Sequence, residues 1–114
     1  MKLTVALALG LFVAGCDQAY AQSYLTASNG MTLYTFDRDS TGLSNCYDSC
    51  ATSWPPFLAP AGAQSPGNGL SAVPRKDGTL QWAKDGAPLY FWQGDRAPGD
   101  TTGDGVGGVW HLAR

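Results

Sequence analysis

The sequence predicts a mainly β fold, a small antiparallel β domain built from two pseudo-symmetric repeats, with one short disulfide-stapled helix. Glycine and proline are frequent, 15 and 7 of 114 residues, which disfavours a helical bundle. Three Asx-Gly pairs lie between β-prone stretches, where they favour tight hairpin turns. A motif also recurs within the chain, which indicates an internal duplication.

The recurring motif is (N/D)-G-x-x-L-Y-x-(F/W)-x-x-D. It occupies positions 29–39 and again positions 85–95, and the same repeat offset aligns Trp54 with Trp110. Because only two copies are present, we expect one pseudo-symmetric domain and not an open solenoid. The expected parts of this domain, residues 22–114, are repeat one at about 22–57, a connector at about 58–69 and repeat two at about 70–114.

Turn signals divide the two repeats into short elements. The second and third Asx-Gly turns join three strands into an antiparallel meander. The best helix candidate is 47–53, which a Pro-Pro pair ends. Residues 58–69 and the glycine-rich stretch 98–108 are expected to be irregular. The expected strands are 24–28, 32–37, 70–76, 79–84, 88–92 and 109–113.

Residues 1–21 have the character of an export signal. A Met-Lys start precedes an apolar run over 3–13, which is too short to span a bilayer because spanning needs about 20 residues. The Val-Ala-Gly-Cys sequence that ends at Cys16 resembles a bacterial lipobox, and we expect a lipid anchor on this cysteine. Asp17 then resembles an inner-membrane retention signal of Gram-negative lipoproteins. Alternatively, Ala-Tyr-Ala before Gln22 fits an ordinary secretory site, which would yield a soluble periplasmic or secreted protein.

Whichever cleavage occurs, Cys46 and Cys50 are the two thiols of the folded part. Export places them in an oxidising compartment, so we expect them to form a disulfide bond. Their spacing suits one helical turn or a tight loop. Closing such a short loop stabilises the fold by about 2 kcal/mol on the chain-entropy estimate.

Each repeat carries two aromatic side chains on one strand, followed by an aspartate. The aromatic residues are two apart along the strand and therefore share a face. The favoured interpretation is an aromatic core layer, and the functional alternative is an exposed platform for a sugar, a quinone or a partner chain. The aspartates are interpreted first as turn caps that accept bonds from backbone N–H groups. The candidate binding residues are therefore Tyr34, Phe36, Asp39, Tyr90, Trp92 and Asp95.

The motifs of both halves together resemble a known family. The first half has Cys46-x3-Cys50 followed by Trp54-Pro-Pro, and the second has Arg75-x-Asp-Gly-Thr-x-Gln81. With the recurring motif, they look like the bacterial secreted-repeat lipoproteins that carry Yx(F/W/Y)xxD, over nearly all of the chain that follows Gln22. The resemblance implies an exported, often lipid-anchored envelope protein of unknown biochemical function. It brings no catalytic residues with it.

A candidate cation site lies near the C-terminus. The sequence Asp-Thr-Thr-Gly-Asp-Gly from Asp100 is similar to the start of a calcium loop, but the twelfth position is His111, where such loops use a bidentate glutamate. The stretch therefore fails as an EF-hand. A looser metal site of Asp100, Asp104 and His111, joined by Asp95, is the alternative to a simple cluster of Gly-Asp turns.

Charge and motif content narrow the function. A net charge of −2 offers no basic footprint for nucleic acid. The sequence holds no phosphate-binding loop, dinucleotide fingerprint or G-x-S-x-G elbow, so we expect no cofactor and favour a non-enzyme. The prediction is a binding or interaction module at the bacterial envelope, tethered by lipid, with an unknown envelope protein or small ligand as partner. The alternative is a redox or copper-handling protein that uses Cys46, Cys50 and His111. In this alternative the two cysteines are reduced, and they bind Cu(I) together with the histidine.

Overall fold

Antiparallel pairing organises the strands of the computed structural model, which describes residues 23–114. The expected signal segment, with Cys16 and both cleavage positions, lies outside the described residues. No helix in the described part of the chain is long and apolar enough to cross a membrane. The elements are β1 (Tyr34–Phe36), α2 (Ser49–Ser53), β2 (Leu58–Ala59), β3 (Leu70–Pro74), β4 (Leu80–Lys84), β5 (Ala87–Pro88), the 3-10 turn η2 (Val106–Gly108) and β6 (Trp110–Leu112).

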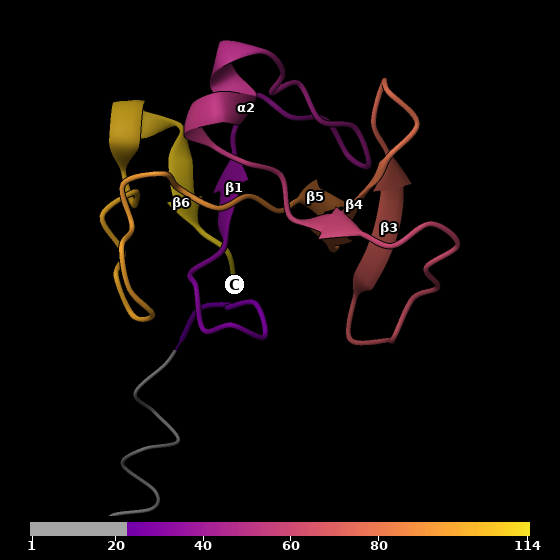
Figure 1. Ribbon diagram of the computed structural model, residues 1–114, viewed down its shortest axis with the longest axis horizontal. Coiled ribbons are helices and arrows are strands. Elements are labelled where there is room, and N and C mark those ends of the chain that lie inside the picture. The colour runs from indigo at the N-terminus through magenta and orange to yellow at the C-terminus, as the bar shows by residue number, and fades with distance from the viewer. Residues whose placement is uncertain (1–22) are drawn as a thin grey trace, which may run out of the picture.

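The strands form two small sheets. β1 pairs with β6, so strands from near the two ends of the described chain lie side by side (Figure 1). In the second sheet β4 is central, with β3 on one side and β2 on the other, and β5 also pairs with β4. Figure 1 shows α2 above β1 and the second sheet to the right of the first. The predicted fold class, a mainly β antiparallel domain with one short helix, is confirmed.

The predicted meander is present as β3–β4–β5, but its last strand covers Ala87–Pro88 and not 88–92, and its last turn has Asp85 and Gly86 at φ 51° and 85°. Positive φ at both central residues defines the turn that suits a two-residue hairpin. The predicted strand at 24–28 was wrong, because the segment forms only an isolated antiparallel bridge between Thr26 and Thr32, and the Leu25 N–H donates instead to Ala113. The predicted irregular stretch 58–69 begins instead with β2, which pairs with β4.

The two repeats meet at their motif tyrosines. The Tyr34 N–H donates to the Tyr90 carbonyl at 2.8 Å, and the Tyr90 N–H donates to the Tyr34 carbonyl at 3.0 Å. These tyrosines occupy the same position in the two copies of the motif, so the bridge lies where a two-fold axis would pass. A further equivalent pair of 2.9 Å backbone bonds runs from the Phe57 N–H to Leu89 and from the Ala113 N–H to Leu33. The predicted pseudo-symmetry is therefore present in the backbone.

Side chains on the two faces of this junction build two clusters. One, which we call the aromatic core, holds the buried residues Tyr34, Cys46, Trp54, Tyr90 and Trp110, with Phe36 and Trp92 packed against it. The residues just before the tyrosines, Leu33 and Leu89, point to the opposite face because side chains alternate along a strand. They form a smaller cluster with Ala27 and Ala113.

The predicted disulfide bond joins Cys46 and Cys50, with Cα atoms 5.2 Å apart. It ties the start of α2 to the loop before it. The helix begins at Ser49, two residues later than predicted, because Asp48 has a φ of 56° and is not helical. Cys46 is fully buried in the aromatic core, and Cys50 packs against that core from the helix.

We expect reduction of the disulfide bond to lower the free energy of unfolding by about 2 kcal/mol, because only a short loop is released in the unfolded chain. Denaturant titration of oxidised and fully reduced protein measures this difference. The reduced protein should remain folded, since the stacked and edge-on ring contacts of the aromatic core are made by residues other than the two cysteines. Loss of cooperative unfolding after reduction would contradict this expectation.

Candidate functional site

Each motif tyrosine is hydrogen bonded to the motif aspartate of the other repeat. The Tyr34 hydroxyl donates to Asp95 Oδ2 at 2.7 Å, and the Tyr90 hydroxyl donates to Asp39 Oδ2 at 2.7 Å. The second oxygen of each aspartate accepts a backbone N–H, from Asn45 at 2.7 Å for Asp39 and from Thr102 at 2.9 Å for Asp95. Each aspartate thus has two roles. One oxygen caps a turn by accepting a backbone N–H, and the other accepts the buried tyrosine hydroxyl of the opposite repeat.

The four motif aromatic residues occupy two different environments. Tyr34 and Tyr90 are fully buried, so they are part of the core and not of an exposed platform. Phe36 and Trp92 are half-buried at the edge of the aromatic core. Only these two of the four rings are therefore within reach of a ligand from solvent.

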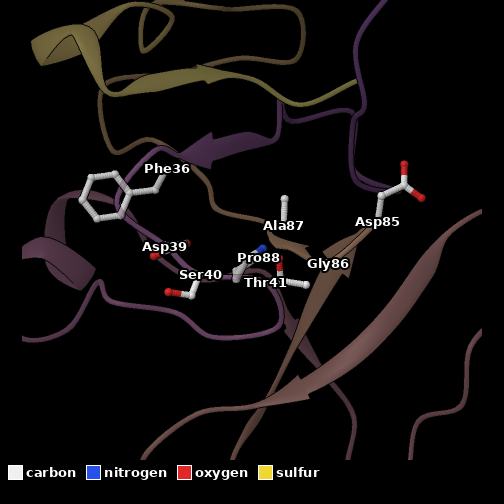
Figure 2. Close-up of a pocket in the computed structure, with 8 residues that line it drawn as sticks. All are labelled: Phe36, Asp39, Ser40, Thr41, Asp85, Gly86, Ala87 and Pro88. Atoms are coloured by element: carbon white, nitrogen blue, oxygen red, sulfur yellow. The ribbon is translucent and has the colours of Figure 1, made fainter.

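A pocket of about 160 Å³ opens beside Phe36 (Figure 2). Asp39 and the turn after it form one wall, and β5 with the turn before it forms the other. In Figure 2 the Asp85 carboxylate is directed away from the Phe36 ring, which leaves Asp39 as the carboxylate beside the ring. The lining residues include no basic side chain and are Phe36, Asp39, Ser40, Thr41, Asp85, Gly86, Ala87 and Pro88.

Burial raises the pKa values of two side chains at this wall of the pocket, Asp39 and Tyr90. Loss of solvation raises the pKa of Asp39 above its usual value of 3.8, although bonds from Asn45 and Tyr90 and the charge of Arg75 act in the opposite direction. Burial also raises the pKa of Tyr90 far above its usual 10.0, so the phenol keeps its proton at neutral pH. Asp39 is therefore a partly desolvated carboxylate that accepts a proton more readily than an exposed aspartate.

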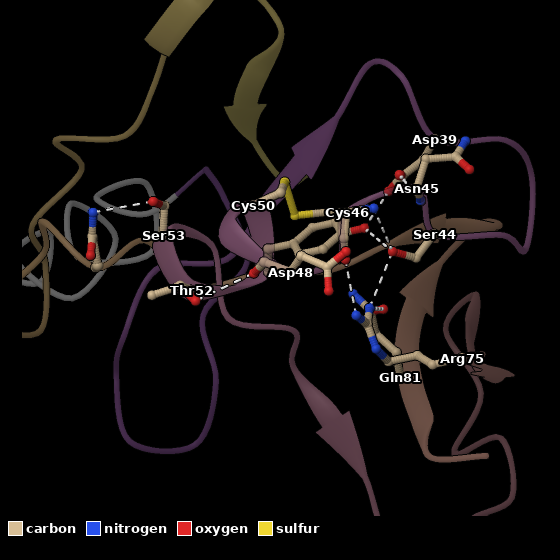
Figure 3. Close-up of a disulfide and its surroundings, with 12 residues drawn as sticks. Asp39, Ser44, Asn45, Cys46, Asp48, Cys50, Thr52, Ser53, Arg75 and Gln81 are labelled. Atoms are coloured by element: carbon tan, nitrogen blue, oxygen red, sulfur yellow. Dashed lines mark hydrogen bonds between the residues drawn. A yellow bond between two sulfur atoms is a disulfide. The ribbon is translucent and has the colours of Figure 1, made fainter. Parts of the chain in front are cut away.

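Behind Asp39 lies a hydrogen-bond network that reaches Arg75 through Tyr90, and Figure 3 shows its part around Ser44 and Arg75. The buried Arg75 guanidinium donates to Ser44 Oγ at 3.1 Å, to Gln81 Oε1 at 2.7 Å and to the Cys46 carbonyl at 2.9 Å. Ser44 Oγ lies 2.6 Å from the Tyr90 hydroxyl. Because that hydroxyl donates its one proton to Asp39, Ser44 is the donor to Tyr90. The network thus runs in one direction from arginine to carboxylate.

Sequence reasoning did not single out Ser44, Arg75 and Gln81 as members of the site. The available signal was the spacing of Arg75 and Gln81 around the Asp77-Gly78 turn, which places Arg75 directly after β3 and Gln81 on the adjacent β4, close enough for a 2.7 Å side-chain bond. No buried side-chain nitrogen or oxygen within residues 23–114 lacks a hydrogen-bond partner. The network holds Asp39 and Tyr90 in place.

The candidate metal ligands lie in separate interactions. The Asp100 carboxylate accepts the Arg96 and Ala97 N–H groups at 2.9 and 3.1 Å. Asp104 accepts the Leu112 N–H at 3.2 Å, and His111 Nε2 lies 2.8 Å from Asp37 Oδ2. In the part of the chain that the structure describes, no three His, Cys, Asp or Glu side chains are grouped as a metal site.

The same finding applies to the alternative copper set. Cys46 and Cys50 are bonded to each other, so they present no thiolate, and they form no ligand group with His111 within residues 23–114.

Comparison with known families agrees with this two-fold arrangement. The chain belongs to the lipoprotein family described as "Secreted repeat of unknown function", which matches it twice, over residues 23–57 and 71–114. The family resemblance predicted from the motifs is confirmed, and it makes this an extracytoplasmic protein. No curated protein and no solved structure matches the chain at a significant level.

Because each motif tyrosine bonds to the aspartate of the other repeat, we expect loss of either hydroxyl to lower the free energy of unfolding by a similar amount. Tyr34→Phe and Tyr90→Phe should each lower the free energy of unfolding by about 1–3 kcal/mol, because each leaves buried polar partners without a bond. Denaturant titration measures both. Tyr47→Phe is the matched control, since the Tyr47 hydroxyl accepts only an exposed N–H from Lys76, and it should change stability by less than about 0.5 kcal/mol. Equal effects of all three variants would contradict the assigned role.

The raised pKa of Asp39 predicts a pH-dependent contribution to stability. The folded protein holds this proton more tightly than the unfolded chain, so the contribution is fully present below about pH 4 and is lost as pH rises through the folded-state pKa. The unfolding free energy of the wild type minus that of Asp39→Asn should therefore decrease from acidic to neutral pH. Titrations at several pH values test this, and a difference that is flat or rises with pH would refute it.

Proposed function

We propose that this chain is a non-enzymatic binding module of the bacterial envelope that captures a cationic head group in the pocket beside Asp39. Family membership supports export. The lipobox at Cys16 supports a lipid tether, at the periplasmic face of the inner membrane if the cell is Gram-negative. Cleavage before Gln22 would instead release the same module in soluble form.

The charge of the pocket carries the proposal. The partly desolvated Asp39 carboxylate stands beside the Phe36 ring, and none of the residues lining this pocket is basic. An ammonium or guanidinium group there would donate a charge-assisted hydrogen bond to the carboxylate and gain a cation–π contact with the ring. Arg75 acts on Asp39 only through its charge, because its printed bonds go to Ser44, Gln81 and the Cys46 carbonyl and not to the carboxylate.

The size of the pocket limits the ligand. A volume of about 160 Å³ is that of roughly five water molecules, so a terminal cation on a short alkyl stem fits and a larger ring system does not. Such a group is present on small amines and on the lysine and arginine side chains of partner proteins. Both sources share a terminal cation, and titrations with free amines and with a lysine-containing peptide distinguish between them.

Calorimetric titration of the purified full chain with n-butylammonium and n-butylguanidinium tests the proposal. Saturable binding is expected at neutral pH, and neutral n-butanol should not bind. Affinity should fall on acidification, because protonation of Asp39 removes the charge that attracts the cation. A lysine-containing peptide that binds more tightly than the free amine would indicate a partner protein as the source.

Three variants make the test specific. Asp39→Asn should lower affinity by more than about tenfold, because a charge-assisted bond is lost. Asp85→Asn is the matched control and should bind normally, since its carboxylate is directed away from Phe36 (Figure 2). Phe36→Leu should weaken binding by about two- to fivefold through loss of the cation–π contact. Equal losses in Asp39→Asn and Asp85→Asn, or binding of n-butanol, would overturn the proposal.

A further inference from the structure

The aromatic core contains a continuous column of four rings. The Phe36 ring stacks on Trp110 with centroids 4.2 Å apart, and Trp110 stacks on Trp54 at 3.8 Å with the ring planes inclined by 2°. Trp54 continues to Trp92 at 4.1 Å. The repeat offset relates Phe36 to Trp92 and Trp54 to Trp110, so the column is itself pseudo-symmetric.

The two buried tyrosines contact the middle of this column. Tyr34 meets Trp54 edge-on with centroids 5.3 Å apart, and Tyr90 meets Trp110 edge-on at 5.1 Å. Each phenol already donates its proton to a carboxylate oxygen 2.7 Å away, Asp95 for Tyr34 and Asp39 for Tyr90. The tyrosines are thus held next to oxidisable rings and next to a proton acceptor.

Stacked tryptophan rings next to tyrosines that are bonded to carboxylates can carry out one-electron chemistry. Tryptophan and tyrosine are the side chains that lose one electron most readily apart from thiols, and electron transfer between them is fast when the rings are in contact. Burial keeps both phenols protonated, so their oxidation must release a proton. A carboxylate at hydrogen-bond distance receives that proton without any movement of the backbone.

Only one oxidisable ring of the column is accessible to an oxidant in solvent, and we call this ring the entrance. Trp54 and Trp110 are 4% and 5% exposed, whereas Trp92 is half-buried and reaches solvent at one end. The opposite end is Phe36, whose benzene ring is much harder to oxidise. An oxidant at the surface therefore removes an electron from Trp92 and not from the inner rings.

We propose that the aromatic core is a one-electron relay, in which oxidising equivalents that arrive at Trp92 pass through Trp54 and Trp110 and end as tyrosyl radicals on Tyr34 and Tyr90. This activity goes beyond cation binding, and the two share Asp39, which accepts the Tyr90 proton in the relay. The class of oxidant is a strong one-electron acceptor outside the cytoplasm, such as an oxygen- or carbonate-derived radical.

The step balances in electrons and protons. The oxidant gains one electron and Trp92 becomes a radical cation. An electron moves from Trp54 to Trp92, and then one moves from Tyr34 to Trp54, or by way of Trp110 from Tyr90. The phenolic proton moves to Oδ2 of Asp95 or Asp39 as the tyrosine loses its electron. The products are a neutral tyrosyl radical and a carboxylic acid, and a one-electron reductant such as a quinol returns the electron while the proton moves back.

Laser flash oxidation of the full chain with a ruthenium(III) polypyridyl complex tests the relay. The background carries Tyr20→Phe, Tyr24→Phe and Tyr47→Phe, so every tyrosyl signal comes from Tyr34 and Tyr90. Transient absorption should show tryptophanyl radical first and tyrosyl radical appearing as it decays. The appearance should slow in D₂O, because a proton moves with the electron. Absence of tyrosyl radical in this background would overturn the proposal.

Two matched tryptophan variants locate the entrance. Trp92→Phe keeps an aromatic ring in the column but removes the oxidisable entrance, so the tyrosyl yield should drop severalfold. Trp82→Phe removes a half-buried tryptophan that packs against the other cluster, and it should leave the tyrosyl yield unchanged. Circular dichroism and the melting temperature establish that both are folded. Equal tyrosyl yields in the two variants would overturn the assigned path.

Discussion

The fold depends on burying the hydroxyls of Tyr34 and Tyr90 without leaving either one unsatisfied. A buried hydroxyl without a partner costs more free energy than a typical hydrogen bond contributes, so each needs a carboxylate or its equivalent nearby. The antiparallel bridge between the two tyrosines brings each side chain to the end of the other repeat's strand, where the motif aspartate stands. Neither repeat can close its own core. A chain with a single copy of the repeat would need a second chain to supply the missing aspartate. In this chain the connector between the repeats keeps the second repeat at high local concentration.

Departures from the two-fold symmetry create the candidate site. The shared frame supplies the stacked rings and the capped aspartates of both halves. The first half adds the disulfide bond and, through Ser44, the link from Asp39 to Arg75. At the positions equivalent to Cys46 and Cys50 the second half has Thr102 and Val106, in a glycine-rich stretch. The disulfide bond of the first half and Arg75 of the second half thus both support the loop that holds Asp39.

The features that sequence could predict are those set by local chemistry. Asx-Gly turns, the meander they connect and the short cysteine loop each depend on residues close together in the chain, and the repeat was visible from self-comparison. The exchange of aspartates between tyrosines was not predictable, because its two bonds span 61 and 51 residues and either repeat alone offers its own aspartate as a candidate. The pocket was missed for the same reason, since its walls come from turns near residues 39–41 and 85–88. The strand expected at 24–28 forms only one bridge, between Thr26 and Thr32, because β propensity does not by itself supply a long paired neighbour.

The position of the disulfide bond ties the geometry of the pocket to the compartment in which the protein folds. The bond fixes Cys46, whose carbonyl holds Arg75, and the preceding Asn45, whose N–H holds Asp39. Such a bond forms in oxidising surroundings, whereas the cytoplasm keeps the two thiols reduced. The wall that carries Asp39 is therefore covalently braced only after export. Before export the same chain has the same rings and carboxylates, but the loop whose N–H holds Asp39 lacks this covalent bond.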